Sequence, residues 1–406
     1  MKRRDFLRGL AVSASGVIIP RFALADSGSK GPSEPPLAAR DDAALASLPG
    51  KIPLIKRSYR PPNYETPIAY FNQAFTPNDA FFVRYHLSNI PKLNAETWKL
   101  SVGGDAASKP LEFTLHDLKK NFEPIEIAAV NQCAGNRRGL IQPPVPGIQW
   151  GYGAMGNARW RGVRLKDILD KAGIKKNALE VAFEGADTGA LPQTPDFSKS
   201  LPLWKALDEN TLIAFEMNGE PLPYWHGFPA RLVVPGWTAT YWMKHLMAIN
   251  VISKPCDAFW MKTAYRIPTG AFTLPAKFDS QETEANTPIT EIMINSLITN
   301  IEDGQKFNLG QGLTVKGIAW DGGHSIARVE VSSDDGKSWR PADLKENHGP
   351  FSWRQWQFRL KPEVKGACRI MVKATNGIGA TQPLQVIWNP SGYHHNGIQQ
   401  LNILVV

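Results

Sequence analysis

The stretch Asn-Gln-Cys-Ala-Gly-Asn-Arg-Arg-Gly, residues 131–139, is the most informative part of this chain. Cys133 stands two residues ahead of a glycine and shortly before Arg137 and Arg138. Positive surroundings favour the thiolate, the form in which cysteine binds metals or acts as a nucleophile. One thiolate without His or Cys partners at ligand spacing cannot build a zinc site. It can bind a soft metal whose other ligands come from a cofactor, although a purely structural role for Cys133 stays open here.

Four further stretches extend the pattern: FFVRYHL (81–87), ARWRGVRLKDIL (158–169), FEGAD (183–187) and EMNGEPLPYWHGFPARLVVPG (216–236). Together with CAGNRR (133–138), they resemble the sulfite oxidase family of molybdenum enzymes, in particular bacterial periplasmic members without a haem domain. The resemblance runs from about residue 60 to the C-terminus. It implies an α+β molybdopterin-binding domain of the sulfite oxidase type, followed by an all-β immunoglobulin-like domain that mediates dimerisation.

The resemblance also implies the cofactor, a molybdenum–pterin group (molybdopterin) in which Cys133 is the one protein ligand of the metal. Its binding residues would be Phe82, Val83, Arg84, Tyr85, His86, Cys133, Asp187, His226, Arg231, Trp242, Met243 and Lys244. A buried pterin phosphate has to be neutralised by cations and hydrogen-bond donors, so these residue types suit the role. The alternative for His226 and Arg231 is a hydrogen-bonded structural pair.

The implied reaction is the oxidation of sulfite to sulfate by oxygen-atom transfer. By the same resemblance, the catalytic residues are Cys133, Arg84, Arg138, Trp150, Tyr265 and Arg354. Guanidinium groups suit a small oxyanion, and Tyr265 is expected to hydrogen-bond an oxygen on the metal. Arg354 is expected to reach into the site from the second domain. Its alternative is a strand arginine that stacks between the tryptophans at 353 and 356.

Two other functions stay open. A nitrate or sulfoxide reductase of the same fold is the alternative enzyme, although Arg354 favours sulfite because nitrate-reducing relatives differ at the matching position. The C-terminal β domain also argues against the sulfoxide-reducing branch, which lacks it. An exported binding protein without a metal is the non-enzymatic alternative, and the molybdenum content would separate it from the enzymes.

The first 25 residues resemble a twin-arginine signal peptide, with Arg3-Arg4, an apolar stretch from Gly9 to Pro20 and the small-residue pattern Ala23-Leu24-Ala25. The sequence therefore predicts a periplasmic protein exported in the folded state. The whole chain has 46 Lys+Arg, 37 Asp+Glu and a formal charge of +9. The signal contains five basic residues and one acidic residue and therefore carries much of this positive charge. The charge of the remaining chain does not predict nucleic-acid binding.

The electron acceptor is expected to be a separate protein. The sequence has no CxxCH motif for covalent haem, so no haem is expected on this chain. No apolar run is long enough to span a membrane. We therefore expect single electrons to leave to a c-type cytochrome or a partner haem subunit. A homodimer is implied by the resemblance.

The expected domain organisation follows changes in sequence texture. Residues 26–58 are rich in Ser, Gly, Pro and Ala and predict a flexible segment, and residues 59–280 form the catalytic domain without a regular βαβ alternation. A polar stretch near 275–288 reads as a linker. Residues 281–406 contain alternating strand patterns and the hairpin signal Asp335-Gly336, which predict an immunoglobulin-like sandwich.

Overall fold

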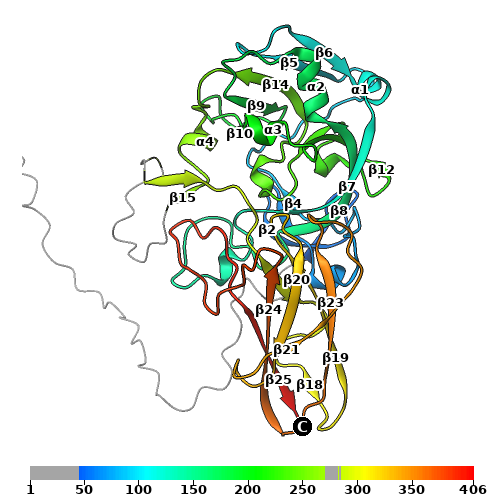
Figure 1. Cartoon of the computed structure of the whole chain (residues 1–406), viewed down its shortest axis with the longest axis vertical. Helices are drawn as coiled ribbons and strands as arrows, with labels where there is room; N and C mark the ends of the chain where they lie inside the picture. Colours follow the sequence, from blue (N-terminus) through cyan, green and yellow to red (C-terminus); the bar gives the residue numbers. More distant parts are fainter. Residues whose placement is uncertain (1–44, 270–281, 283–284) are drawn as a thin grey trace, which may run out of the picture. The chain divides into compact units, whose positions relative to one another are not determined.

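The computed structural model describes residues 45–269, 282 and 285–406 (Figure 1). The expected signal peptide, residues 26–44 of the N-terminal segment and most of the expected linker lie outside the described residues. The segment expected to be flexible through residue 58 is structured from residue 45 onward, because its apolar side chains Leu54 and Ile55 are buried in a small sheet. No helix in the described ranges has the length and apolar character needed to cross a membrane.

The N-terminal sheet has the order β1-β2-β3-β4 and is antiparallel throughout. Its strands are β1 (Leu45–Ala46), β2 (Leu54–Ser58), β3 (Asn63–Glu65) and β4 (Val83–Arg84). Within the FFVRYHL stretch (81–87), the strand β4 covers Val83–Arg84. The large side chains of the stretch are buried, so this sheet positions residues 82–86 for the site.

Two five-stranded sheets form the body of the first domain. One has the order β10-β9-β14-β5-β6, with β10 (Ser198–Pro202), β9 (Glu180–Gly185), β14 (Leu246–Ile252), β5 (Lys99–Gly103) and β6 (Leu111–Thr114). The other has β12 (Glu220–Pro221), β11 (Leu212–Met217), β8 (Met155–Arg164) and β7 (Pro124–Gln132) in that order, with β13 (Arg231–Val233) also on β11. Only β14 and β5 pair in parallel among these described strands, so the expected α+β class without βαβ units is confirmed.

The two longest helices of the described residues begin at Leu115 and Leu165, and local chemistry explains both. The helix α1 (Leu115–Asn121) begins at a capping box between Thr114 and Asp117. The helix α2 (Leu165–Ala172) buries Leu165, Ile168, Leu169 and Ala172, the spacing of one helical face. The remaining helical segments are short: α3 (Leu203–Ala206), α4 (Phe259–Lys262), η2 (Ile68–Asn72), η3 (Arg138–Leu140), η4 (Tyr224–His226) and η5 (Ala239–Tyr241).

The C-terminal part is the predicted sandwich, with strands from each of its sheets running side by side (Figure 1). One sheet contains β17 (Asn295–Ile298), β19 (Leu313–Trp320), β23 (Arg354–Leu360) and β22 (Asp343–Leu344). The other contains β18 (Lys306–Phe307), β25 (Gln399–Val405), β24 (Gly366–Asn376), β20 (Ile326–Ser332) and β21 (Arg340–Pro341). Asp335 and Gly336 both have positive φ, as the hairpin prediction requires. A short ribbon of β15 (Arg266–Pro268) and β16 (Asn286–Pro288) precedes the sandwich.

The end of β7 is fixed against the sandwich. Val130 and Met155 share a buried cluster with Ile318 and Trp320 of β19, and the Trp320 indole donates to the Gln132 side chain at 2.5 Å. The backbone N–H of Val130 donates to Phe351 O. The residue after β7 is Cys133, so these contacts hold the thiol at a boundary between the two domains.

Candidate active site

Cys133 lies in a tight turn that begins where β7 ends. Its N–H donates to Ala154 O, and its carbonyl accepts from the N–H of Asn136, both at 2.9 Å. The Asn136 side-chain oxygen accepts from the N–H of Ala154 at 3.1 Å, which ties the turn to the start of β8. The side chain of Cys133 is 7% exposed and is a free thiol. The turn therefore presents one thiol at a fixed point.

The two arginines of the turn have different roles. A Cβ atom on Gly135 would lie 2.5 Å from Arg138 Nη2, so only glycine lets the Arg138 side chain fold back over the turn. Arg137, with φ of 67°, turns to the sandwich instead and donates to Asn295 Oδ1 at 2.7 Å and Ser296 O at 2.9 Å. Burial lowers the pKa of Arg137 to about 10. Arg137 therefore binds the sandwich, and Arg138 is the arginine whose side chain folds back over the Cys133 turn.

A pocket opens next to Cys133. Ten of the predicted cofactor residues and Tyr265 line it together with Cys133. The predicted residues of the lining are Phe82, Arg84, Tyr85, His86, Cys133, Asp187, His226, Arg231, Trp242, Met243, Lys244 and Tyr265. The other lining residues were not predicted: Asn131, Ala134, Phe197, Trp225, Ala239 and Thr240.

The inner wall carries buried cations. Arg231, on β13, lies between the rings of Trp160 and Trp242 at 5.0 and 5.6 Å and donates to His226 O and Trp242 O. Burial lowers its pKa to about 9. Lys244 donates to Arg84 O at 2.8 Å, and burial followed by the charge of Arg231 lowers its pKa well below the usual value. Asp187 is the carboxylate beside them, and its pKa is raised by burial against the opposing charge of Lys244. An anion would relieve this excess of desolvated positive groups.

Tyr265 connects the outer wall to two other predicted residues. Its hydroxyl contacts His86 Nε2 and lies 3.5 Å from Arg84 Nη2. The His86 ring stacks on Phe197 with centroids 3.9 Å apart, and burial lowers the pKa of His86 well below its usual value. Burial raises the pKa of Tyr265, while the charges of Arg84 and Arg138 act in the opposite direction. A neutral imidazole, a neutral phenol and a guanidinium thus face one side of the cavity.

The residues present fit a pterin cofactor with an anionic group. Three lining residues have a buried polar atom without a hydrogen-bond partner among the described residues: Asn131 Nδ2, Arg231 Nε and Thr240 Oγ1. Buried donors of this kind are costly unless a ligand satisfies them. Within the same described ranges, no three His, Cys, Asp or Glu side chains could hold a metal ion. A metal here therefore needs ligands from a cofactor in addition to Cys133.

Val83, Arg138 and Trp150 lie near the pocket but outside its lining. Val83 packs with Leu54 and Tyr64 in the N-terminal sheet, so only its backbone can serve the site. Trp150 is fully buried in the main core. Arg138 donates to Ser391 O at 2.8 Å and Ile148 O at 3.2 Å, behind the pocket wall.

The prediction that Arg354 reaches into the site is wrong in this structure. Arg354 lies on β23 opposite Ala319 of β19, and its guanidinium donates to Lys345 O at 3.0 Å and Ile326 O at 3.4 Å. These acceptors belong to the sandwich, so the Arg354 side chain stabilises that domain. The alternative of a strand arginine describes its position better than a role in the pocket.

The sandwich reaches the site through the loop 389–394 instead. The Tyr393 ring stacks on Tyr265 with centroids 5.5 Å apart and an interplanar angle of 22°, and Arg138 lies 5.3 Å above Tyr393. The amide of Asn389 accepts from Tyr393 N and donates to Tyr393 O. The N–H of His394 donates to Ala134 O, next to the thiol. Nothing in the sequence pattern predicts this loop, because it has no strand or helix periodicity.

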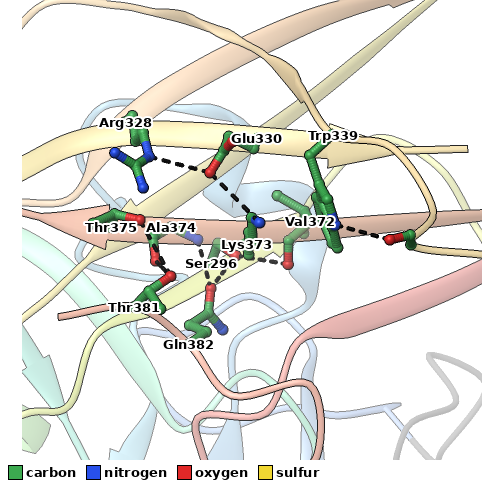
Figure 2. Close-up of polar contacts among 11 residues, drawn as sticks. Ser296, Arg328, Glu330, Trp339, Val372, Lys373, Ala374, Thr375, Thr381 and Gln382 are labelled. Carbon is green, nitrogen blue, oxygen red and sulfur yellow. Dashed lines mark hydrogen bonds and ion pairs between the residues drawn. The ribbon is translucent and has the colours of Figure 1, made fainter. Parts of the chain in front are cut away.

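Figure 2 shows how the chain before this loop is anchored. Gln382 accepts from the Ser296 hydroxyl at 2.5 Å and from the N–H of Ala374 at 3.0 Å. Outside the view of the figure, it donates to Asn396 O at 3.0 Å. Glu330 pairs with Arg328 and Lys373 on the same sheet. The loop that carries Tyr393 is therefore tied at both ends to the sandwich.

One buried cation near the site was missed in the sequence. Lys199, on β10, is 1% exposed and donates to Trp260 O at 2.7 Å. Its ammonium lies 4.4 Å from the ring centre of Tyr241 and 5.4 Å from that of Tyr265. Burial lowers its pKa to about 7. The alternation of β10 puts Lys199 inward, but a lysine at an inward position could be found only with the strand's register known.

Comparison with known families identifies both domains of the chain. Residues 86–260 match the model of the oxidoreductase molybdopterin-binding domain, and residues 286–405 match the Mo-co oxidoreductase dimerisation domain. Mitochondrial sulfite oxidase of Rattus norvegicus is 35% identical over 388 residues, which cover 92% of this chain and 69% of that protein. The nitrate reductase of Hordeum vulgare is 31% identical, over 87% of this chain and 41% of that protein.

A solved structure shows the same fold. The sulfane dehydrogenase SoxCD of Paracoccus pantotrophus aligns with a TM-score of 0.73 and 25% identity, over 95% of this chain and 97% of that chain. The two domain matches account for both parts of the structure described above, and the pocket lies against Cys133. The cofactor implied is a molybdenum–pterin group, and no haem domain is evident in the chain. This chain belongs to the sulfite oxidase family of molybdenum oxidoreductases.

Proposed function

We propose that this protein oxidises sulfite to sulfate. The observation that carries the proposal is the cavity wall opposite Cys133, where Arg84 and Tyr265 stand beside a neutral His86. A guanidinium offers several fixed donors to a small oxyanion. The similarity to mitochondrial sulfite oxidases along nearly the whole chain supports the same substrate.

The residues of the chain would act mainly by binding and orientation. Cys133 would hold the metal, and the cationic wall formed by Arg231 and Lys244 would hold the anionic part of the pterin. When bound, the cofactor supplies oxygen-atom transfer and accepts two electrons. Arg84 would orient the oxyanion, and the Tyr265 hydroxyl would hydrogen-bond a reacting oxygen, its raised pKa keeping it protonated. Overall, sulfite and water give sulfate, two protons and two electrons.

The electrons are proposed to leave singly to a c-type cytochrome or a partner haem subunit. This rests on the absence of a CxxCH motif in the sequence. A periplasmic location, reached by twin-arginine export, is proposed from the first 25 residues. The match of residues 286–405 to a dimerisation domain supports a homodimer.

Nitrate reduction is the second candidate, because nitrate reductases match the chain at 31–32% identity. Arg354 was expected to separate the two substrates. Since its guanidinium is bound to backbone carbonyls of the sandwich, it cannot serve that purpose. The choice between the substrates therefore rests on direct assay.

The test is sulfite-dependent reduction of ferricyanide by protein whose molybdenum content has been measured. We expect activity in the native protein and its loss in Cys133→Ser. The matched control is Cys368→Ser, which changes a cysteine of the sandwich that is far from the pocket lining and should leave the rate unchanged. A molybdenum-loaded preparation that ignores sulfite but reduces nitrate with a viologen donor would replace sulfite by nitrate.

A further inference from the structure

The N-terminal segment passes over one corner of the cofactor pocket. Residues 48–52 connect β1 to β2, and Ile52 N donates to Asp79 O at 3.3 Å. Two adjacent pocket residues contact this connection. The Trp225 indole donates to Pro49 O at 2.8 Å, and His226 Nε2 lies 2.5 Å from Lys51 Nζ. A segment outside the matched cofactor domain is thus part of the pocket's second layer.

The Lys51 ammonium is surrounded by acceptors. Besides His226 Nε2, it lies 2.5 Å from Asn78 O and 2.9 Å from Phe81 O. An ammonium has three N–H donors and no acceptor, so three contacts use all of them. Burial lowers the pKa of Lys51 to about 7, and the charge of Asp79 acts in the opposite direction. Arg231 and Lys244 also lower the pKa of His226, whereas a hydrogen bond with the Asn78 backbone acts to raise it.

This geometry restricts the imidazole. The ring of His226 is 3% exposed and packs edge-on against Phe81 at 5.2 Å. Burial, followed by the charge of Lys51, lowers the pKa of His226 well below its usual value, so the ring is neutral and carries one proton. A neutral ring that accepts at Nε2 must carry that proton on Nδ1.

We propose that Lys51 is a cofactor-positioning residue, which holds His226 in the Nδ1–H form so that the pocket wall keeps an N–H donor for the anionic pterin group. Second-layer partners fix metal-site histidines in a comparable way, and their loss weakens binding about 10- to 100-fold. The proposal concerns the cofactor site of the family and does not depend on which substrate is oxidised.

The first test is the tautomer of His226, measured by long-range ¹H–¹⁵N NMR on protein labelled with ¹⁵N-histidine and loaded with its cofactor. The His226→Gln variant identifies the signal. We expect Nδ1–H in the native protein and in Lys51→Arg, since a guanidinium is also only a donor. In Lys51→Met we expect a change to Nε2–H, because Asn78 O, which hydrogen-bonds the His226 ring, then loses the competing ammonium.

The second test is cofactor retention, read as molybdenum and pterin per chain after prolonged dialysis. Lys51→Met should lose the cofactor about tenfold faster than the native protein. The matched control is Lys56→Met on β2, an exposed lysine of the same segment. This control also shows whether the segment tolerates the change of residue type.

Two results would overturn the proposal. One is a native His226 in the Nε2–H form, a result observed on the native protein that cannot be confused with misfolding. The other is unchanged retention of the cofactor in a Lys51→Met protein that melts cooperatively. If sulfite activity were absent while both tests gave the expected result, the substrate assignment would fail and the role of Lys51 would stand.

Discussion

At the scale of single residues, the structure separates arginines that serve the pocket from arginines that serve the fold. Arg84 lines the cavity and lies 3.5 Å from the Tyr265 hydroxyl. Arg354 is bound to two carbonyls of the sandwich and Arg137 to Asn295 and Ser296. All three belong to the same residue type, so only the partners of each guanidinium reveal its role.

This separation gives a prediction for two variants. Arg84→Gln should raise the KM for sulfite, because a hydrogen bond to a charged group contributes about 1.5–3 kcal/mol, equivalent to ~10- to 100-fold in affinity. Arg354→Met should change KM by less than about twofold, since its partners lie outside the pocket. Steady-state assays with molybdenum content measured in parallel would check both. A large increase in KM in Arg354→Met, without one in Arg84→Gln, would show that Arg354 binds the substrate and would contradict the prediction.

At the scale of elements, the sequence could predict what local chemistry determines. The helices at Leu115 and Leu165 and the alternating strands β19, β20 and β24 follow from periodicity and capping. The lining residues around Cys133, β4 and β13 follow from the family resemblance. The loop 389–394 could not be found, because its place at the site depends on long-range contacts to Arg138, Ala134 and Tyr265. The position of Arg354 was predicted wrongly for the same reason, because the contacts of its guanidinium with Lys345 and Ile326 depend on the tertiary fold.

That loop yields a prediction for Tyr393. Tyr393→Leu removes the stack on Tyr265 and the contact with Arg138, interactions worth about 0.5–1.5 and 0.5–1 kcal/mol. We expect kcat/KM to fall about tenfold, because Tyr265 and Arg138 lose the ring that orients them. Tyr393→Phe keeps the ring and is the matched control, expected within about twofold of the native value. Equal losses in both variants would mean that the hydroxyl matters rather than the stacking.

At the scale of the whole molecule, the two domains cooperate through the end of β7. Trp320, Asn295 and Ser296 of the sandwich bind Gln132 and Arg137 on either side of Cys133. Tyr393 approaches from the same domain. Cys133 is thus held by residues from both domains. We infer that the sandwich has two roles: it positions the residues around Cys133, and it can also mediate dimerisation.

The same molecule concentrates buried cations around one pocket, which gives a prediction about cofactor removal and pH. Burial lowers the pKa of Lys51 and Lys199 to about 7 from an ordinary 10.5. Between these values the unfolded chain binds more protons than the folded chain, so the stability of cofactor-free protein should rise as pH increases from 7 toward 10. An anionic cofactor favours the charged lysines and raises their pKa, so the loaded protein should show a flatter profile.

The measurement is the melting temperature of loaded and of cofactor-free protein from pH 6 to 9.5. The difference between the two forms should be largest at pH 6, by roughly 2–5 °C beyond the difference at pH 9.5. Lys51→Met in the cofactor-free protein should remove part of the slope, whereas Lys56→Met should leave it unchanged. Parallel profiles for loaded and cofactor-free protein would show that these buried cations do not sense the cofactor.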